Sequence, residues 1–195
     1  MALPVLVKFY LYKSENRDIN IKVLNNVPSL PSDYVMDNIL LYGEYEIIGH
    51  QVLQEEDFDF PISYGKELAS TSDKVFLQWG LISKSLPIKE FNKYTTGENK
   101  LFRAGSLSGN KRNIYAYYSV GFRPAYGEYE LNKAFEKGKF NFDAVDHYKA
   151  AFDLRNPANV FIKEEIFAAF GLDPSLSYAE NCKLTNTPST LSFIN

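Results

Sequence analysis

The residues that could act as nucleophiles or bases are few in this chain. It holds one cysteine, Cys182, and two histidines, His50 and His147. A serine or cysteine nucleophile needs a neighbouring base, and the sequence has no Gly-x-Ser-x-Gly turn that would expose a serine. His147 stands four residues after Asp143, which on a helix favours a surface ion pair over a catalytic dyad. Cys182 falls in a polar stretch, which favours an unreactive thiol.

Metal binding is not expected either. A single cysteine excludes a zinc ribbon, and neither His-x-His nor His-Glu-x-x-His occurs. The acids between Glu55 and Asp59 lack the central glycine and distal glutamate of a calcium loop. We therefore expect no cofactor and no metal. Paired carboxylates of a hydrolase can still meet in space from distant parts of a chain, so a small hydrolase stays as the third functional alternative.

The distribution of charge is the strongest functional pattern in the sequence. Residues 23–65 contain eight acidic residues and no Lys or Arg, whereas residues 84–123 contain eight basic residues against two acidic ones. Two such segments either pair with each other inside one fold or present charged faces to solvent. An exposed acidic segment would steer a basic partner toward the protein. Both interpretations stay open from the sequence.

The basic segment also contains aromatic residues, as some nucleic-acid-binding surfaces do. Between Lys111 and Arg123, Tyr and Phe stand beside Lys and Arg, a pattern typical of base-stacking platforms. Their spacing differs from the signature of RNA-recognition domains, and the whole chain has a net charge of −3. A core strand with basic ends explains the stretch more simply. A nucleic-acid-binding module using residues 84–123 is therefore only the second functional alternative.

These residues are expected to be positioned by one α+β domain spanning residues 1–195. The length of 195 residues and the hydrophobic share of 45% suit a single globular core. We expect a mainly antiparallel sheet from residue 1 to about residue 125 and helices packed on it in residues 126–195. The expected strands are 3–12, 39–42, 45–49, 74–83 and 114–122, and the expected helices are 130–137, 143–154 and 160–170.

Two of these elements carry specific expectations. The strand at residues 74–83 should be an interior one, with Gly80 at a bulge or close approach. We expect Trp79, Phe76 and Ile47 to be buried.

The helix at residues 160–170 has an apolar stripe of Ile162, Ile166 and Phe170, and Gly171 fits the left-handed position that ends a helix. The tail beyond Pro174 is polar and is expected to be irregular.

The sequence indicates a cytoplasmic protein. No stretch approaches the roughly 18 apolar residues that a spanning helix requires. The opening Met1–Val7 lacks the basic leading region and the cleavage site of a signal peptide, and it is typical of a strand.

The first half of the chain resembles a known family. Ile39-Leu-Leu-Tyr-Gly-Glu-Tyr-Glu-Ile-Ile-Gly-His50 precedes Glu55-Glu-Asp-Phe-Asp-Phe-Pro-Ile-Ser-Tyr-Gly65 and Lys74-Val-Phe-Leu-Gln-Trp-Gly80. A Gly-x-aromatic-x-Ile-Ile-Gly strand, an acidic segment ending in proline and a short hydrophobic strand follow one another. This order resembles the bacterial polymorphic-toxin immunity proteins of the immunity protein twenty-six family. Val7–Tyr12 is compatible with the opening strand of that family.

The resemblance implies a cytoplasmic protein that is not an enzyme. It would bind a cognate toxin domain, often a nuclease, and block it, as in contact-dependent inhibition between bacteria. The family supplies no catalytic residue. Combined with the acidic segment, the resemblance leads to the hypothesis of a surface that binds a basic toxin domain. The hypothesised partner-binding residues are Glu44, Glu46, Glu55, Glu56, Asp57, Phe58, Asp59 and Tyr64.

Overall fold

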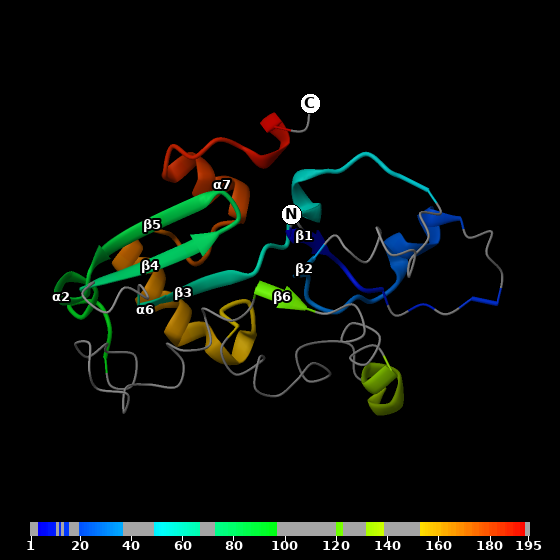
Figure 1. The fold of residues 1–195 in the computed structure, drawn as a ribbon, viewed down its shortest axis with the longest axis horizontal. Coiled ribbons are helices and arrows are strands. Elements are labelled where there is room, and N and C mark those ends of the chain that lie inside the picture. Colours follow the sequence, from blue (N-terminus) through cyan, green and yellow to red (C-terminus); the bar gives the residue numbers. More distant parts are fainter. Residues whose placement is uncertain are drawn as a thin grey trace. The chain divides into compact units, whose positions relative to one another are not determined.

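The structure is a computed structural model of the whole chain (Figure 1). It describes residues 4–10, 12, 14–15, 20–36, 49–66, 73–96, 120–122, 132–138 and 153–193. The chain forms two compact units: unit 1 comprises Met1–Gln54 and Ser119–Ala150, and unit 2 comprises Glu55–Tyr118 and Ala151–Asn195. Each unit is thus built from two separate stretches of chain. That the two units act as one domain stays a prediction.

Unit 1 contains a small three-stranded sheet. Strand β1 (Pro4–Val7) pairs antiparallel with β2 (Asp33–Met36), and β2 pairs parallel with β6 (Val120–Phe122). The expected sheet is therefore mixed here rather than purely antiparallel. A 3-10 helix, η1 (Ile21–Asn26), lies between β1 and β2 in the sequence. The strands predicted at residues 39–42 and 45–49 lie outside the described residues except for Gly49, which is not in a strand.

Unit 2 contains an antiparallel sheet in the order β3-β4-β5, with β4 in the centre (Figure 1). The strands are β3 (Ile62–Lys66), β4 (Lys74–Trp79) and β5 (Ile82–Pro87). Along β4, Val75, Leu77 and Trp79 are buried at 0%, 0% and 7% exposure. This alternation places them on one face, because successive side chains of a strand point to opposite faces. The central strand and the burial of Trp79 are confirmed.

Phe76 is only half-buried, so that part of the expectation was wrong. It stands between Val75 and Leu77 on β4, and the same alternation turns its side chain away from the main core face. Ile47 lies outside the described residues.

The predicted strand at residues 74–83 is two strands joined by a tight turn at Gly80. Gly80 has a φ of +54°, and a Cβ there would lie 2.6 Å from both the Phe60 ring and the Tyr178 hydroxyl. The backbone N–H of Leu81 donates a hydrogen bond of 2.9 Å to the Tyr178 hydroxyl. The predicted close approach at Gly80 is therefore real, and it permits a hairpin because glycine tolerates this φ without steric cost.

Helices follow the sheet, as expected for an α+β fold. Among the described helices the longest is α6 (Val160–Phe170), which buries Ile162, Ile166, Phe167 and Phe170. Its C-cap Gly171 is left-handed at φ +65°, as predicted. Residues 132–137 are helical, as predicted for that part of 130–137. Of the helix predicted at residues 143–154, residues 143–152 lie outside the described residues, and residues 153–154 are not helical. The shorter elements are η2 (Glu55–Asp57), α2 (Ile88–Phe91), η4 (Pro157–Asn159), α7 (Tyr178–Leu184) and η5 (Thr190–Phe193).

The expectation of an irregular tail was wrong, because α7 forms within it. Ser177 accepts a hydrogen bond from the backbone of Glu180, and the Glu180 carboxylate accepts from the Ser177 backbone N–H at 2.8 Å. This reciprocal capping box satisfies N–H groups that a helix start otherwise leaves unpaired. The helix buries Cys182, which is 2% exposed, and burial raises the pKa of its thiol. Cys182 is a core residue and does not lie in a polar tail.

Removing the cap should weaken this helix. We expect Ser177→Ala to lower the free energy of unfolding by about 1 kcal/mol at neutral pH. Hydrogen bonds from Ser177 hold the pKa of Glu180 below its usual value, so their stabilisation is present above the unfolded pKa and is lost as the pH falls through the folded one. The difference in the free energy of unfolding between wild type and Ser177→Ala should therefore become smaller in acid. Urea unfolding at several pH values measures this difference, and a larger difference in acid would contradict the proposed bond between Ser177 and the Glu180 carboxylate.

Within the described residues, no helix is both long and apolar enough to cross a bilayer.

Candidate functional site

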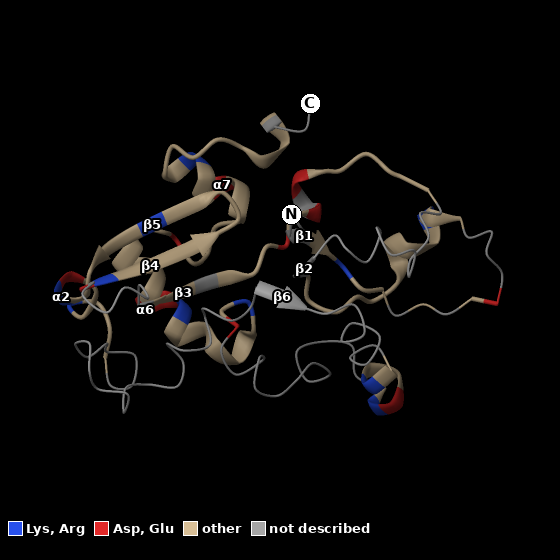
Figure 2. Ribbon diagram, in the orientation of Figure 1, with Lys and Arg blue, Asp and Glu red and all other residues tan. Residues whose placement is uncertain are grey.

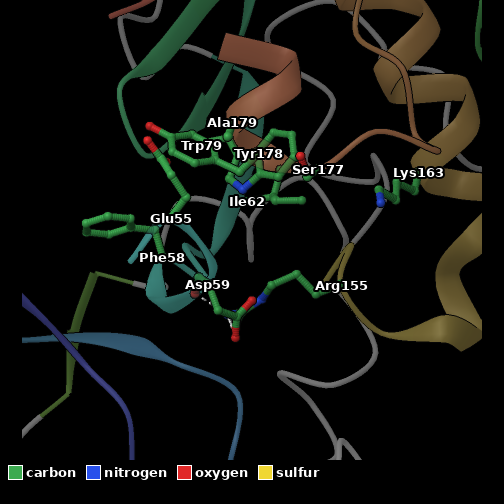
Figure 3. A pocket seen from close by; sticks show the side chains of 10 residues that line it. All are labelled: Glu55, Phe58, Asp59, Ile62, Trp79, Arg155, Lys163, Ser177, Tyr178 and Ala179. Carbon is green, nitrogen blue, oxygen red and sulfur yellow. Dashed lines mark hydrogen bonds and ion pairs between the residues drawn. The ribbon is translucent and has the colours of Figure 1, made fainter. Parts of the chain in front are cut away.

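Unit 2 contains a pocket of about 460 Å³ beside the end of β4 (Figure 3). Its volume falls in the range of pockets that hold ligands or inserted side chains. Segments far apart in the sequence build it: the stretch around η2, the end of β4, the turn before η4, helix α6 and the start of α7. The lining residues are Glu55, Phe58, Asp59, Ile62, Trp79, Arg155, Lys163, Ser177, Tyr178 and Ala179.

Aromatic rings form one wall of the pocket. The ring centroids of Trp79 and Tyr178 are 5.2 Å apart in an edge-to-face arrangement, and those of Trp79 and Phe167 are 5.3 Å apart. Phe60 packs edge-on against Tyr178 at 5.1 Å and stacks on Phe58 at 5.5 Å. Such contacts add to the free energy gained by burying the rings. Burial also raises the pKa of Tyr178 to about 12, so its phenol is neutral at physiological pH.

Arg155 holds together two distant parts of the pocket. Its Nη2 lies 2.7 Å from Oδ2 of Asp153, and its Nη1 lies 3.1 Å from Oδ2 of Asp59. Nη1 also donates to the backbone carbonyl of Asp59 at 2.9 Å. The Arg155 side chain is only 13% exposed, so water screens the pair with Asp153 weakly. The positive charge of Arg155 is therefore balanced within the protein.

Lys163 is the second cation on the pocket wall. Its Nζ donates to the carbonyl oxygen of Pro174 at 3.1 Å and lies 5.0 Å from the centre of the Phe167 ring. Partial burial lowers the pKa of this ammonium, because burial disfavours the charged form. These contacts direct the group toward the Phe167 ring of its own helix and the loop after it.

Glu55 presents a carboxylate that is only half satisfied. Its Oε1 accepts a hydrogen bond from the hydroxyl of Ser189, which ties η2 to the C-terminal stretch of unit 2. Its Oε2 is buried and has no hydrogen-bond partner within the described residues. A buried carboxylate oxygen of this kind carries an uncompensated loss of hydration.

The structure brings together three of the hypothesised partner-binding residues: Glu55, Phe58 and Asp59 all line the pocket. Asp57 is half-buried in η2, and Glu56 belongs to the same turn. Tyr64 is 3% exposed on β3 opposite Leu77, which places it in the core. Glu44 and Glu46 lie outside the described residues.

Several pocket residues were not anticipated from the sequence, namely Arg155, Lys163 and Tyr178. The Ser-x-x-Glu pattern at residues 177–180 is a capping-box signature, and it would have predicted α7 and hence placed Tyr178 at a helix start. No local pattern joins Arg155 to Asp59, because 96 positions separate them.

The second alternative, nucleic-acid binding, gains little from the described part of its basic segment. Lys84 donates to the carbonyl oxygen of Phe170 at 2.8 Å, and Lys93 pairs with Glu90 at 2.6 Å. Residues 97–119, which hold most of the basic aromatic stretch, lie outside the described residues.

The third alternative, a hydrolase, needs two carboxylates in one pocket, and Glu55 and Asp59 meet that condition. Asp59, however, is engaged by Arg155, and Glu55 is engaged by Ser189. Hydrolysis by paired carboxylates needs both groups directed at the substrate, so the engagement of Asp59 by Arg155 argues against this pair. His147 lies outside the described residues, and no cluster of three metal-ligating side chains occurs among the residues that are described.

Comparison with known protein families identifies a similarity in the first part of the chain. Residues 1–75 match the model of the family described as Immunity protein 26. No curated protein and no solved structure matches the chain. The match confirms the resemblance noted in the first part of the sequence and supports an immunity function. It ends inside β4, so Trp79, Arg155, Lys163 and Tyr178 lie beyond the matched region.

Proposed function

We propose that this chain is a cytoplasmic immunity protein that binds a cognate toxin domain one-to-one and neutralises it by contact, without catalysis. The observation that carries the proposal is the match of residues 1–75 to the Immunity protein 26 family. An immunity function implies a protein partner, since such a protein protects the cell by blocking a toxin.

The acidic segment supports a basic toxin domain as the partner. Residues 23–65 carry eight acids without a Lys or Arg, and Figure 2 shows the acidic turn η2 in red at the start of unit 2. Hydrogen bonds position two of these carboxylates, that of Glu55 through Ser189 and that of Asp59 through Arg155. A cluster of charges of one sign mainly raises the rate of association with an oppositely charged partner.

Co-expression with the toxin tests the proposal. The toxin domain encoded beside this gene should stop the growth of a bacterial host, and co-expression of the full chain should restore growth. The purified proteins should form a 1:1 complex in calorimetry. A matched control is an unrelated toxin domain of similar charge, which the chain should not neutralise. Absence of any complex with the neighbouring toxin would refute the function.

Neutralising η2 should slow complex formation. The triple variant Glu55→Gln, Glu56→Gln, Asp57→Asn removes three carboxylates. The amide oxygen introduced at position 55 can still accept the hydrogen bond from the Ser189 hydroxyl. We expect association several-fold slower at low salt, with the difference fading near 1 M salt, where the screening length is about 3 Å. Stopped-flow association at several salt concentrations measures this. An unchanged rate at low salt would remove η2 from the recognition surface.

A further inference from the structure

The Glu55 end of the pocket combines a carboxylate with aromatic rings. Figure 3 shows Glu55 beside Phe58, Trp79 and Tyr178, whereas Lys163 lies on the opposite side of the pocket. The buried Oε2 of Glu55 receives no hydrogen bond from any described residue. This oxygen has almost no accessible surface, so a bound guest reaches it only when the Glu55 carboxylate turns toward the pocket that it lines. A donor N–H from the guest would then compensate the hydration that the oxygen has lost.

The charges around the pocket favour a cationic guest at this end. The guanidinium of Arg155 is balanced by the carboxylates of Asp59 and Asp153. Lys163 faces the carbonyl of Pro174 and the ring of Phe167. Among the described residues, no Lys or Arg forms an ion pair with Glu55. The negative charge at the aromatic end is thus available to a positive group.

The rings favour a guanidinium in particular. Trp79 and Tyr178 stand 5.2 Å apart at this end, with Phe58 beside them in Figure 3. Aromatic rings attract cations. Trp79 and Tyr178 are only 7% and 6% exposed, so the half-buried Phe58 offers most of the ring surface to a guest. Guanidinium is planar and weakly hydrated, it stacks on rings, and it carries several N–H donors that can reach a carboxylate. An ammonium is compact and strongly hydrated, so it would lose more on entering a pocket walled by rings.

We propose that the Glu55 end of this pocket binds an arginine side chain. Resting on the proposed function, we assign that arginine to the cognate toxin, where it acts as an anchor residue inserted into unit 2. Arginine is one of the residues that most often dominate the binding energy of protein interfaces, especially when it fills a desolvated pocket.

Trp79 allows a direct test, because it is the only tryptophan of the chain and it lines the pocket. Its fluorescence and its single indole N–H resonance therefore report whether the pocket is occupied. The full chain is titrated with Nα-acetyl-arginine amide, with the citrulline analogue, which has nearly the same shape without the charge, and with the lysine analogue. We expect a saturable response to the arginine probe and about tenfold weaker binding of the other two. Citrulline lacks the charge that strengthens a hydrogen bond to a carboxylate, and the lysine ammonium loses more hydration on entering the pocket.

Glu55→Gln is the decisive variant, because its amide oxygen can still accept from Ser189 while the charge is lost. We expect it to bind the arginine probe about tenfold more weakly and the citrulline probe unchanged. Glu164→Gln, at an exposed position of α6 outside the pocket lining, removes the same charge elsewhere in unit 2 and should bind like wild type. Equal binding of arginine and citrulline, or no effect of Glu55→Gln, would overturn the site, and equal binding of lysine would overturn the choice of arginine.

Binding of the toxin itself tests separately whether the arginine belongs to the toxin. If Glu55→Gln weakens the toxin complex and the arginine probe competes with the toxin, the anchor is the toxin's arginine. If the toxin binds Glu55→Gln as tightly as wild type, the assignment of the pocket to the toxin fails, while the proposed function stands because binding persists. If wild type binds the arginine probe but no toxin, the proposed function fails and the pocket remains a guanidinium site.

Discussion

Trp79→Ala should lower the free energy of unfolding by about 3–5 kcal/mol, the cost typical of emptying a buried aromatic site. Trp79 is 7% exposed and packs against Phe167 of α6 and Tyr178 of α7. The substitution therefore removes the ring through which the central strand contacts both helices. The cavity would remain largely unfilled, since the neighbouring rings are held by contacts of their own, such as the bond from Leu81 to Tyr178.

Urea unfolding followed by far-UV circular dichroism measures this loss, because the variant no longer has a tryptophan to report by fluorescence. Phe161→Ala is the matched control: Phe161 is also a large aromatic of unit 2, but it is 77% exposed at the start of α6. We expect the control to change stability by less than about 0.5 kcal/mol. Similar small losses in both variants would show that Trp79 is not part of a packed core.

Local periodicity explains which elements could be predicted from the sequence. The alternation of Val75, Leu77 and Trp79 is visible in the sequence, and so is the helical spacing of Ile162, Ile166 and Phe170 ahead of Gly171. Both patterns arise within a few residues, so they can be recognised without knowledge of the tertiary contacts. Strand β4 and helix α6 were therefore predictable.

The reversal at Gly80 could not be located in the same way. Leu81 and Ile82 continue the apolar run beyond Trp79, so the pattern alone indicates one long strand. The chain turns there against the hydroxyl of Tyr178, which accepts from Leu81 across 97 positions of sequence. Helix α7, which supplies Tyr178, was missed because it is only seven residues long and lies in a stretch rich in Ser, Thr and Asn, although its capping box was present in the sequence.

The candidate site was predictable only in part. Charge clustering drew attention to Glu55, Phe58 and Asp59, and these residues do line one pocket. Burial of Tyr64 and the pairing of Asp59 with Arg155 depend on tertiary contacts that no local pattern encodes. The distinction between an acid that meets a partner and an acid that holds the fold together is therefore a property of the packed structure.

The family match covers only part of the pocket. It spans residues 1–75 and thus includes Glu55, Phe58, Asp59 and Ile62. The remaining lining residues come from β4, α6, α7 and the turn before η4, beyond the matched region.

Arg155→Met should destabilise the protein by about 2 kcal/mol. The substitution keeps a long side chain but leaves the carboxylates of Asp153 and Asp59 without their shared cation. Losing one partner of a buried ion pair typically costs about 3–5 kcal/mol. The cost here should be lower, because the Asp59 side chain is 40% exposed and water screens part of the repulsion. Urea unfolding of the full chain measures the change.

A double-mutant cycle separates the ion pair from simple packing. In an Asp59→Asn background, Arg155→Met should cost about 1 kcal/mol less than in wild type, since one of the stranded charges is already gone. Arg155→Lys should recover only part of the loss, because an ammonium cannot reproduce the hydrogen bonds that the guanidinium makes to Asp153 and to the Asp59 carbonyl. Strict additivity in the cycle would mean that the Asp59 carboxylate contributes no coupling energy to Arg155, whose stabilising effect would then come from Asp153, from the Asp59 carbonyl and from packing.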